Sequence, residues 1–550
     1  MRNLLILFIT AAFLVTANYS YSDNGVLAKH KSRKKKSEEN KSWHTLYPKK
    51  DKVAGISLNK AYQEILKNKI PHKVIIAVID GGVDINHEDI KNRIWTNRKE
   101  IPVNNVDDDN NGFIDDIHGW NFLGNSNGEN IKQETMELTR LFRDMTRKFG
   151  DTILSKCKIK DTTGFAYYKK ICREYYAKYI QATLDYNMLK NSSLDKYFTK
   201  KDSIITDYLK KTDYSIMDLL SVNTKDSVVN ESKYYLLTLE IKNFDIEKYK
   251  EMKEYYYNNY LYGVDTSYNP RKIIGDNPTQ LDGIHYGNSD VIANTPSHGT
   301  FVSGIIAAER NNNIGMDGIA DSVEIMVIRA IPNGDERDKD VANAIRYAIN
   351  NGAKIINMSF GKGYSPEKIF VDDVLKLAEE KDVLLVHAAG NDAENNDVVE
   401  NYPKKYFNDG KVITGNWLEV GASTKHLDKN LVASFSNYGK KNVDIFAPGE
   451  DIYSLKPDNK YTTGDGTSFA SPMVAGVAAL LKSYYPQLTA KEIKKIIMDS
   501  SLKLEKKKVY KQDSKSTKKE KVRFGTLSVT GGLLNAYNAV NMAEKIYNKK

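Results

Sequence analysis

Cysteine is nearly absent from this chain of 550 residues, which contains only Cys157 and Cys172. So few thiols exclude a fold held together by several disulfides, and they exclude a zinc site built from cysteine alone, which takes about four thiolates. The sequence does not give the distance between the two cysteines. A single disulfide between them after export and two free thiols are therefore both open.

Long apolar runs are also scarce, and the one that occurs lies at the N-terminus. Residues 4–17 follow one positive charge, have the length of the apolar core of a signal peptide and end in small residues suited to cleavage. This run is shorter than the roughly 20 apolar residues that span a membrane, although an uncleaved N-terminal anchor is the alternative. We expect a signal peptide at residues 1–17, cleaved no later than Ser22, and an exported protein that is periplasmic or extracellular.

The net charge of +10 is unevenly distributed along the chain. Residues 29–36, in a basic linker expected at 18–42, and residues 503–522 each contribute +6, so the rest of the chain is slightly acidic. Such local lysine clusters do not form the broad basic face that binds nucleic acid. We expect no nucleic-acid partner, no integral membrane span in the mature protein and at most a weak association with an anionic envelope surface.

Short β-branched runs alternate with helical patterns from Trp43 onward, and 41% of the residues are hydrophobic, enough for a core. The first run, residues 74–79, has the composition of a strand buried on both faces and ends at Asp80. The alternation predicts an α/β domain over residues 43–550, with a mainly parallel sheet and helices on both faces. The later predicted strands are 323–328, 354–358, 383–389 and 443–446, and helical patterns cover 338–350 and 366–380.

Residues 121–290 differ in composition from the rest. They hold 19 of the 35 tyrosines, many lysines and asparagines, few glycines and a helix-like spacing of apolar residues. We therefore predict a mainly helical insertion at 121–290 within the α/β domain, with an independent domain as the alternative. Its tyrosines are compatible with a packed helical module, with a lid over the site, or with a surface for a sugar or a protein.

Three short motifs carry residues suited to nucleophilic catalysis. Asp80 follows the first predicted strand, whereas His298 and Ser468 each begin a helical pattern rich in small residues. A serine hydroxyl needs an adjacent base at neutral pH, histidine suits that role, and a buried carboxylate fixes the histidine tautomer. These residue types predict a catalytic triad of Asp80, His298 and Ser468.

The order Asp, His, Ser and the motifs around these residues resemble the subtilases, the subtilisin-like serine peptidases. The resemblance covers about residues 50–120 and 291–545 and leaves the insertion out. It implies a subtilisin-like fold and an endopeptidase that hydrolyses polypeptides through an acyl-enzyme intermediate. A catalytically silent subtilase-fold protein that binds through its insertion is the alternative.

Two further segments are similar to the same family. Asn391 resembles the asparagine that binds the oxyanion together with the backbone amide of the catalytic serine. The resemblance also implies two segments that bind extended substrate, in part by main-chain hydrogen bonds. The residues of these segments are Ser359, Phe360, Gly361, Ala388, Ala389 and Gly390.

An acidic stretch at residues 107–116 places oxygen-bearing side chains at alternate positions, with a glycine for a sharp turn, which suits a hard cation such as Ca²⁺. His118 stands where an EF-hand has its glutamate, so a complete EF-hand is excluded, and the stretch instead resembles an acidic loop of many subtilases. We expect structural Ca²⁺ and no organic cofactor, with a cation-free turn as the alternative. The expected ligands are Asp107, Asp109, Asn111, Asp115 and the carbonyl group of Phe113.

Overall fold

The computed structural model describes most of the chain from residue 41 onward. The ranges are 41–154, 161–190, 192–212, 214–241, 246–281, 285–293, 296–407, 415–513 and 516–547, together with Phe244 and Gly410. The expected signal peptide, nearly all of the basic linker, and Cys157 lie outside the described residues, so the leader and the disulfide stay predictions. None of the helices in these ranges is long and apolar enough to cross a membrane.

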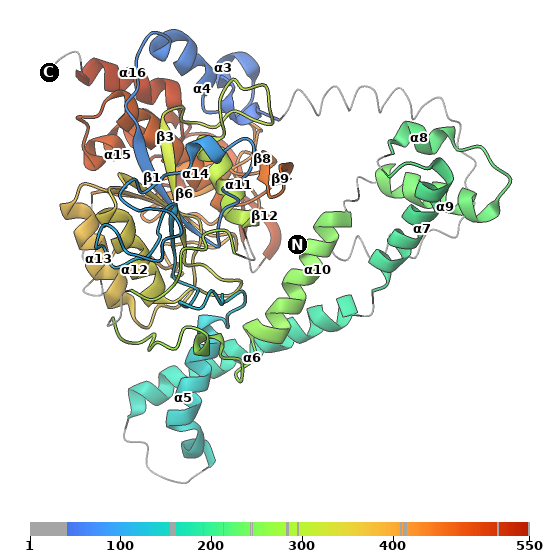
Figure 1. Ribbon diagram of the computed structural model, residues 1–550, viewed down its shortest axis with the longest axis horizontal. Coiled ribbons are helices and arrows are strands. Elements are labelled where there is room, and N and C mark those ends of the chain that lie inside the picture. Colours follow the sequence, from blue (N-terminus) through green and yellow to red (C-terminus); the bar gives the residue numbers. More distant parts are fainter. Residues whose placement is uncertain are drawn as a thin grey trace. The chain divides into compact units, whose positions relative to one another are not determined.

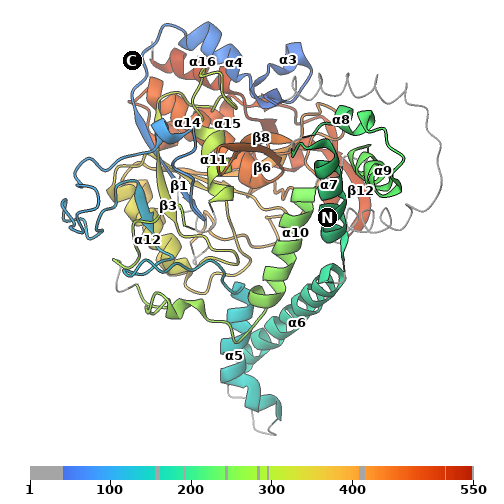
Figure 2. The same ribbon diagram turned by 45° about the vertical axis from the view of Figure 1, so that its right-hand side comes forward.

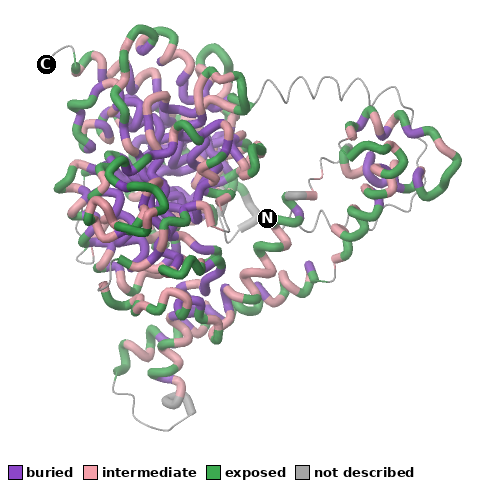
Figure 3. Tube along the Cα trace, in the orientation of Figure 1, coloured by how far each residue is buried: buried purple, intermediate pink, exposed green. Residues whose placement is uncertain are grey.

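The described chain forms two compact units. The first, which we call the sheet unit, comprises residues 41–140 and 267–547, and the second, the helical unit, comprises residues 141–266. Figure 3 shows that buried residues are concentrated in the sheet unit, whereas most of the helical unit is intermediate or exposed.

A nine-stranded sheet forms the centre of the sheet unit (Figure 1). Its strand order is β10-β13-β7-β6-β5-β4-β1-β3-β2. All its neighbours pair in parallel except β10 and β13, which confirms the predicted mainly parallel sheet. Two small hairpin sheets, β8–β9 and β11–β12, lie outside it. The strands are β1 (Val74–Asp80), β2 (Gly119–Asn121), β3 (Val323–Arg329), β4 (Ile355–Met358), β5 (Leu384–Ala388), β6 (Trp417–Ser423), β7 (Ile445–Pro448), β8 (Ile452–Lys456), β9 (Lys460–Gly464), β10 (Leu502–Lys503), β11 (Lys508–Asp513), β12 (Ser516–Arg523) and β13 (Gly532–Leu533).

Helices cover both faces of the sheet because successive side chains of each buried strand point in opposite directions. On β1, Ile76 and Val78 join the core shared with one set of helices, and Ala77 and Ile79 join the core on the other face. The first set is α11 (Ser297–Ala307), α14 (Thr467–Tyr484), α15 (Ala490–Asp499) and α16 (Ala536–Tyr547), and the second is α12 (Asp338–Asn350) and α13 (Lys368–Glu380).

The helical unit is built from consecutive helices (Figures 1 and 2), and both α10 and the short helix η4 contact α6. Two small apolar clusters hold the unit together, one around Ile205 and Leu236 and one around Leu189 and Tyr249. The helices are α5 (Glu137–Leu154), whose first turn belongs to the sheet unit, α6 (Thr162–Lys190), α7 (Leu194–Leu209), α8 (Ile216–Ser221), α9 (Ser227–Ile241), α10 (Ile246–Asn258) and η4 (Asn259–Gly263).

The helical unit is shorter than the 121–290 expected from composition. Asn121 ends β2, which pairs with β3, and Trp120 and Phe122 are buried in the core that includes Tyr347 of α12. The chain that returns from the helical unit rejoins the sheet unit at residue 267, and Arg271 there forms a buried ion pair with Asp340. Residues 121–140 and 267–290 therefore belong to the sheet unit by their contacts, and the insertion at 121–290 stays a prediction.

The two ends of the helical unit lie close together. Near its start, the Phe142 ring stacks on the Tyr175 ring with 3.9 Å between centroids, and near its end the Tyr175 hydroxyl donates to the Val264 carbonyl oxygen at 2.9 Å. A short linker of about six residues, which spans up to roughly 20 Å, is therefore long enough to replace residues 142–264.

We expect the chain with this replacement to fold, because deletions are tolerated where few contacts of the remaining domain are lost. Thermal unfolding followed by circular dichroism should show a cooperative transition and a lower helix content. The matched control deletes 121–290, which removes part of β2 and Arg271, and should leave no cooperative transition. Equal behaviour of the two deletions would contradict a helical unit limited to residues 141–266.

Candidate active site

The carboxyl end of β1 and the first turn of α11 bring Asp80 and His298 together. The Asp80 side chain is buried and accepts a hydrogen bond from the Gly81 amide at 2.8 Å. His298 Nδ1 lies 2.8 Å from Asp80 Oδ2 and 3.0 Å from Oδ1. The carboxylate therefore holds the Nδ1–H tautomer, which leaves Nε2 available as a base.

Gly299 allows this approach of helix to strand. A β carbon at this position would collide with the Gly82 carbonyl oxygen and would lie 3.1 Å from the β carbon of Asp80. Any side chain would force α11 away from the end of β1. The contact between His298 and Asp80 therefore requires glycine at position 299.

The charge of His298 depends on two opposing effects. Removal of water from the ring lowers the pKa of His298, but the neighbouring Asp80 charge and hydrogen bond outweigh it and raise the pKa above its ordinary value. The side chain is still 43% exposed, so it remains accessible to a reactant.

Ser468 is the second residue of α14, and it is tied to the end of β4. Its hydroxyl donates to the Ser359 carbonyl oxygen at 3.1 Å, and the Ser359 hydroxyl donates to the Ser468 carbonyl oxygen at 2.8 Å. The ring of Phe469, the next residue, lies 5.7 Å from the His298 ring between centroids, so Ser468 and His298 share one corner of the unit. For His298 to take the proton of Ser468, the Ser468 hydroxyl must turn from Ser359 toward His298. Catalytic hydrogen bonds of this kind often form fully only when substrate is bound.

Asn391 lies beyond the carboxyl end of β5 and beside the start of α14. Its Oδ1 accepts hydrogen bonds from the Thr467 amide and hydroxyl, each at 2.9 Å, which leaves Nδ2 as the donor aimed elsewhere. The position that a Gly466 β carbon would take is 3.8 Å from Asn391 Nδ2 and 3.6 Å from the Ser468 amide nitrogen. Both nitrogens therefore lie near one point beside Ser468.

The two predicted substrate segments end β4 and β5, which pair with each other in the sheet. Gly361 is exposed and Phe360 is partly buried. Ser359 differs, because its buried hydroxyl bonds Asn357, Ser468 and Ser471 and so joins β4 to α14. Its side chain is a structural link.

Sequence reasoning missed Asn401, which lies between the two substrate segments. Its Nδ2 donates to the carbonyl oxygens of Ala388 and Ala389 at 3.2 and 3.1 Å, and its Oδ1 is 2.5 Å from where a Gly361 β carbon would be. Ala389 accepts a further bond from Asn396, and the Gly390 amide donates to Thr467. No motif signals Asn401, because a single loop asparagine is an ordinary residue.

In the acidic loop, three carboxylates come together. Ligand oxygens of Glu100, Asp107 and Asp109 all lie within 4.8 Å of one another. No lysine or arginine among the described residues forms an ion pair with them, although loop amides donate hydrogen bonds to all three carboxylates, and carboxylate oxygens are the ligands that a hard cation prefers. Glu100 lies before the acidic motif and was not predicted.

The other expected ligands have different partners. The Asp115 carboxylate accepts from the amides of Asn104 and Asn105, and the Asn111 side chain bonds the Phe113 amide and Asp116. The Phe113 ring packs against aromatic residues of the core. Of the predicted acidic ligands, the structure thus brings Asp107 and Asp109 together, and Asn111 lies beside both because its amide donates to each carboxylate.

Known proteins resemble parts of this chain in sequence. A sequence model of the subtilase family matches residues 72–526. The thermophilic serine proteinase of Bacillus sp. (strain AK1) is 40% identical over 188 residues, 34% of this chain and 43% of that protein. Thermitase of Thermoactinomyces vulgaris is 37% identical over 217 residues, 38% of this chain and 72% of thermitase. A solved chain described under subtilase cytotoxin SubAB assembly has 27% identity and a TM-score of 0.39, over 48% of this chain and 82% of that one. The chain thus spans less than half of the first relative.

The raised pKa of His298 predicts how the reactivity of Ser468 depends on pH. Protonated His298 cannot accept the serine proton, so labelling by a small fluorophosphonate should rise with pH, with a midpoint above the ordinary histidine pKa of about 6.5. Asp80→Asn should lower that midpoint and slow labelling. A midpoint unchanged by Asp80→Asn would contradict the assignment.

The raised pKa of His298 also affects the stability of the fold. Protonated His298 stabilises the fold below the pKa that the group has in the unfolded chain, and this stabilisation is lost as pH rises through the pKa of the folded state.

Proposed function

The chain belongs to the subtilase family, and from this membership and the site geometry we propose that it is a serine endopeptidase. The observation that carries the proposal is the buried Asp80 carboxylate bonded to His298 Nδ1, in the corner that also holds Ser468. A binding protein has no need of this costly arrangement, which leaves a partly exposed imidazole beside a serine at a helix start.

The reaction follows from the positions of these groups. Ser468 Oγ attacks the carbonyl carbon of the scissile bond while His298 Nε2 takes its proton, and Asp80 stabilises the resulting imidazolium. Asn391 Nδ2 and the Ser468 amide hold the oxyanion. His298 then gives its proton to the leaving amine, which leaves an acyl group on Ser468. Water, activated by His298, hydrolyses this acyl-enzyme and frees Ser468.

Polypeptide substrates would bind in extended form at the ends of β4 and β5. The exposed Gly361 and the loop around Gly390 offer main-chain groups for strand pairing with the residues that precede the scissile bond. Asn401, between these segments, would contact the side chain nearest the scissile bond.

The proposed site of action is outside the cytoplasm. Its support is the apolar run at residues 4–17 with the pattern of a signal peptide. The basic linker would at most give weak attraction to an anionic envelope surface, and nucleic acid has no role in this proposal.

We also propose that Glu100, Asp107 and Asp109 hold a structural Ca²⁺. The support is the convergence of three carboxylates without a lysine or arginine ion pair among the described residues. A bound divalent cation would neutralise their repulsion and fasten the acidic loop, stabilising the folded state alone.

The catalytic assignment predicts graded losses. Ser468→Ala should abolish labelling and lower peptide hydrolysis by roughly a million-fold, whereas Asn391→Ala should cost about 100- to 1000-fold in kcat with little change in KM. Ser221→Ala, an exposed serine of the helical unit, serves as the control and should have no effect. A folded parent protein whose Ser468 never reacts would favour the silent, insertion-based binding protein.

The calcium assignment predicts a stability effect. A chelator should lower the Tm by roughly 5 °C, the size expected when a ligand at about 100 times its Kd is removed. Asp109→Asn should remove this sensitivity. Asp115→Asn is the matched control, since its carboxylate caps loop amides, and this variant should keep the response to the chelator. An unchanged melting curve with the chelator would refute the site.

A further inference from the structure

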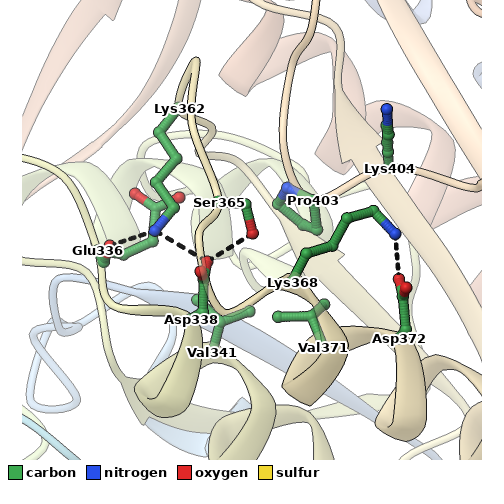
Figure 4. Close-up of a pocket in the computed structure, with 10 residues that line it drawn as sticks. All are labelled: Glu336, Asp338, Val341, Lys362, Ser365, Lys368, Val371, Asp372, Pro403 and Lys404. Carbon is green, nitrogen blue, oxygen red and sulfur yellow. Dashed lines mark hydrogen bonds and ion pairs between the residues drawn. The ribbon is translucent and has the colours of Figure 1, made fainter. Parts of the chain in front are cut away.

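A buried ion network lies beside residues 359–361, which are proposed to pair with substrate and which we call the substrate edge. Lys362 is at the centre of this network (Figure 4). The Lys362 side chain is 1% exposed, and its ammonium group has three partners. It lies 2.8 Å from Glu137 Oε2, 2.9 Å from Asp338 Oδ1 and 2.8 Å from the Glu336 carbonyl oxygen. Every proton of the ammonium group therefore has an acceptor, as a buried charge requires.

Lys362 directly follows Gly361, the exposed end of the segment proposed to pair with substrate. Its main chain is fixed as well, because its amide and carbonyl groups pair with Tyr402 at 3.0 and 2.9 Å. The ammonium group and the main-chain pairing thus hold one residue at both ends. The peptide plane of Gly361 has little freedom to move unless one of these contacts breaks.

The principal anion of the network, Glu137, is itself held rigidly. It lies in the first turn of α5, and Arg140 bonds its carboxylate through Nε at 3.1 Å and Nη2 at 2.5 Å. Arg140 also donates to the carbonyl oxygens of Asp335 and Glu336 at 3.0 and 3.1 Å. Burial by itself raises the pKa of Glu137, but Arg140 and Lys362 hold it well below its usual range, so the carboxylate stays charged.

We propose that Lys362 is a positioning residue, which fixes the segment 359–361 for main-chain pairing with extended peptides by anchoring it to the first turn of α5 and the start of α12. The inference rests on the proposed peptidase function. It assigns a role in substrate binding to a residue whose side chain does not touch the substrate, and it makes peptide affinity depend on the turn from which the helical unit begins.

The same cavity contains a matched ion pair with a different role. Lys368 also lines it, is nearly as buried and pairs with Asp372 one turn later in α13 (Figure 4). This pair closes within one helix and does not reach the substrate segment. Loss of either lysine leaves a buried carboxylate without its cation, so both losses destabilise the fold. Only the loss of Lys362 frees the substrate edge.

The test compares Lys362→Met with Lys368→Met on two kinds of substrate. For peptides with four residues before the scissile bond, Lys362→Met should raise KM roughly tenfold, the loss expected for about one hydrogen bond, with kcat within about twofold. Labelling by a small fluorophosphonate, which needs no strand pairing, should change less than about twofold. Lys368→Met should lower the Tm and leave KM unchanged.

Further variants keep the test decisive. If Lys362→Met does not fold, Glu137→Gln replaces it in the test. This variant keeps the shape of the side chain but removes the charge opposite Lys362, and it should also raise KM. An equal rise in KM for both lysine variants, or no rise in Lys362→Met and Glu137→Gln, would overturn the positioning role. An unlabelled parent protein would overturn the peptidase function itself, whereas a labelled parent with unchanged KM in these variants would overturn only this inference.

Discussion

The close approach of α11 to the carboxyl end of β1 is the constraint on which the active site depends. Because Gly299 has no side chain, the helix comes near enough for His298 Nδ1 to reach both oxygens of Asp80. The buried carboxylate then sets the tautomer and raises the pKa of the imidazole. A separation larger by one methyl group would break the contact with His298 and leave the buried Asp80 carboxylate without a cationic partner, which is costly.

The start of α14 is the second organising element, since the ends of β4 and β5 converge on it. Ser468 and Ser359 exchange hydrogen bonds at the end of β4, and Thr467 bonds Asn391 and Gly390 beyond β5. The residues proposed as nucleophile, oxyanion donors and substrate segment are therefore fixed to a single helical turn. Parallel sheets make this possible, because the carboxyl ends of neighbouring strands open on the same side.

Two buried arginines explain how the sheet unit accommodates an insertion between Asp80 and His298. Arg140 fastens the outgoing chain to the loop before α12, and Arg271 fastens the returning chain by a two-nitrogen pair with Asp340 in the first turn of α12. Such fork-shaped pairs fix direction as well as distance. The substrate segment is connected to Arg140 as well, because Lys362 pairs with Glu137 and Glu137 with Arg140. The same contacts therefore fasten the start of the insertion and keep the substrate edge rigid.

The sequence by itself determined the elements with strong local signals. The β-branched runs predicted five strands of the mainly parallel sheet, although they missed β2, β6, β10 and β13, and the motifs around Asp80, His298, Ser468 and Asn391 identified residues that the structure gathers in one region. Only the tertiary structure supplied Glu100, Asn401 and Lys362, and only it moved the helical unit's limits to 141–266. The reason is physical: a strand or a motif is encoded by neighbouring residues, whereas a carboxylate cluster or a buried ion network depends on which distant segments meet. One glutamate, asparagine or lysine gives no sign of this in a sequence.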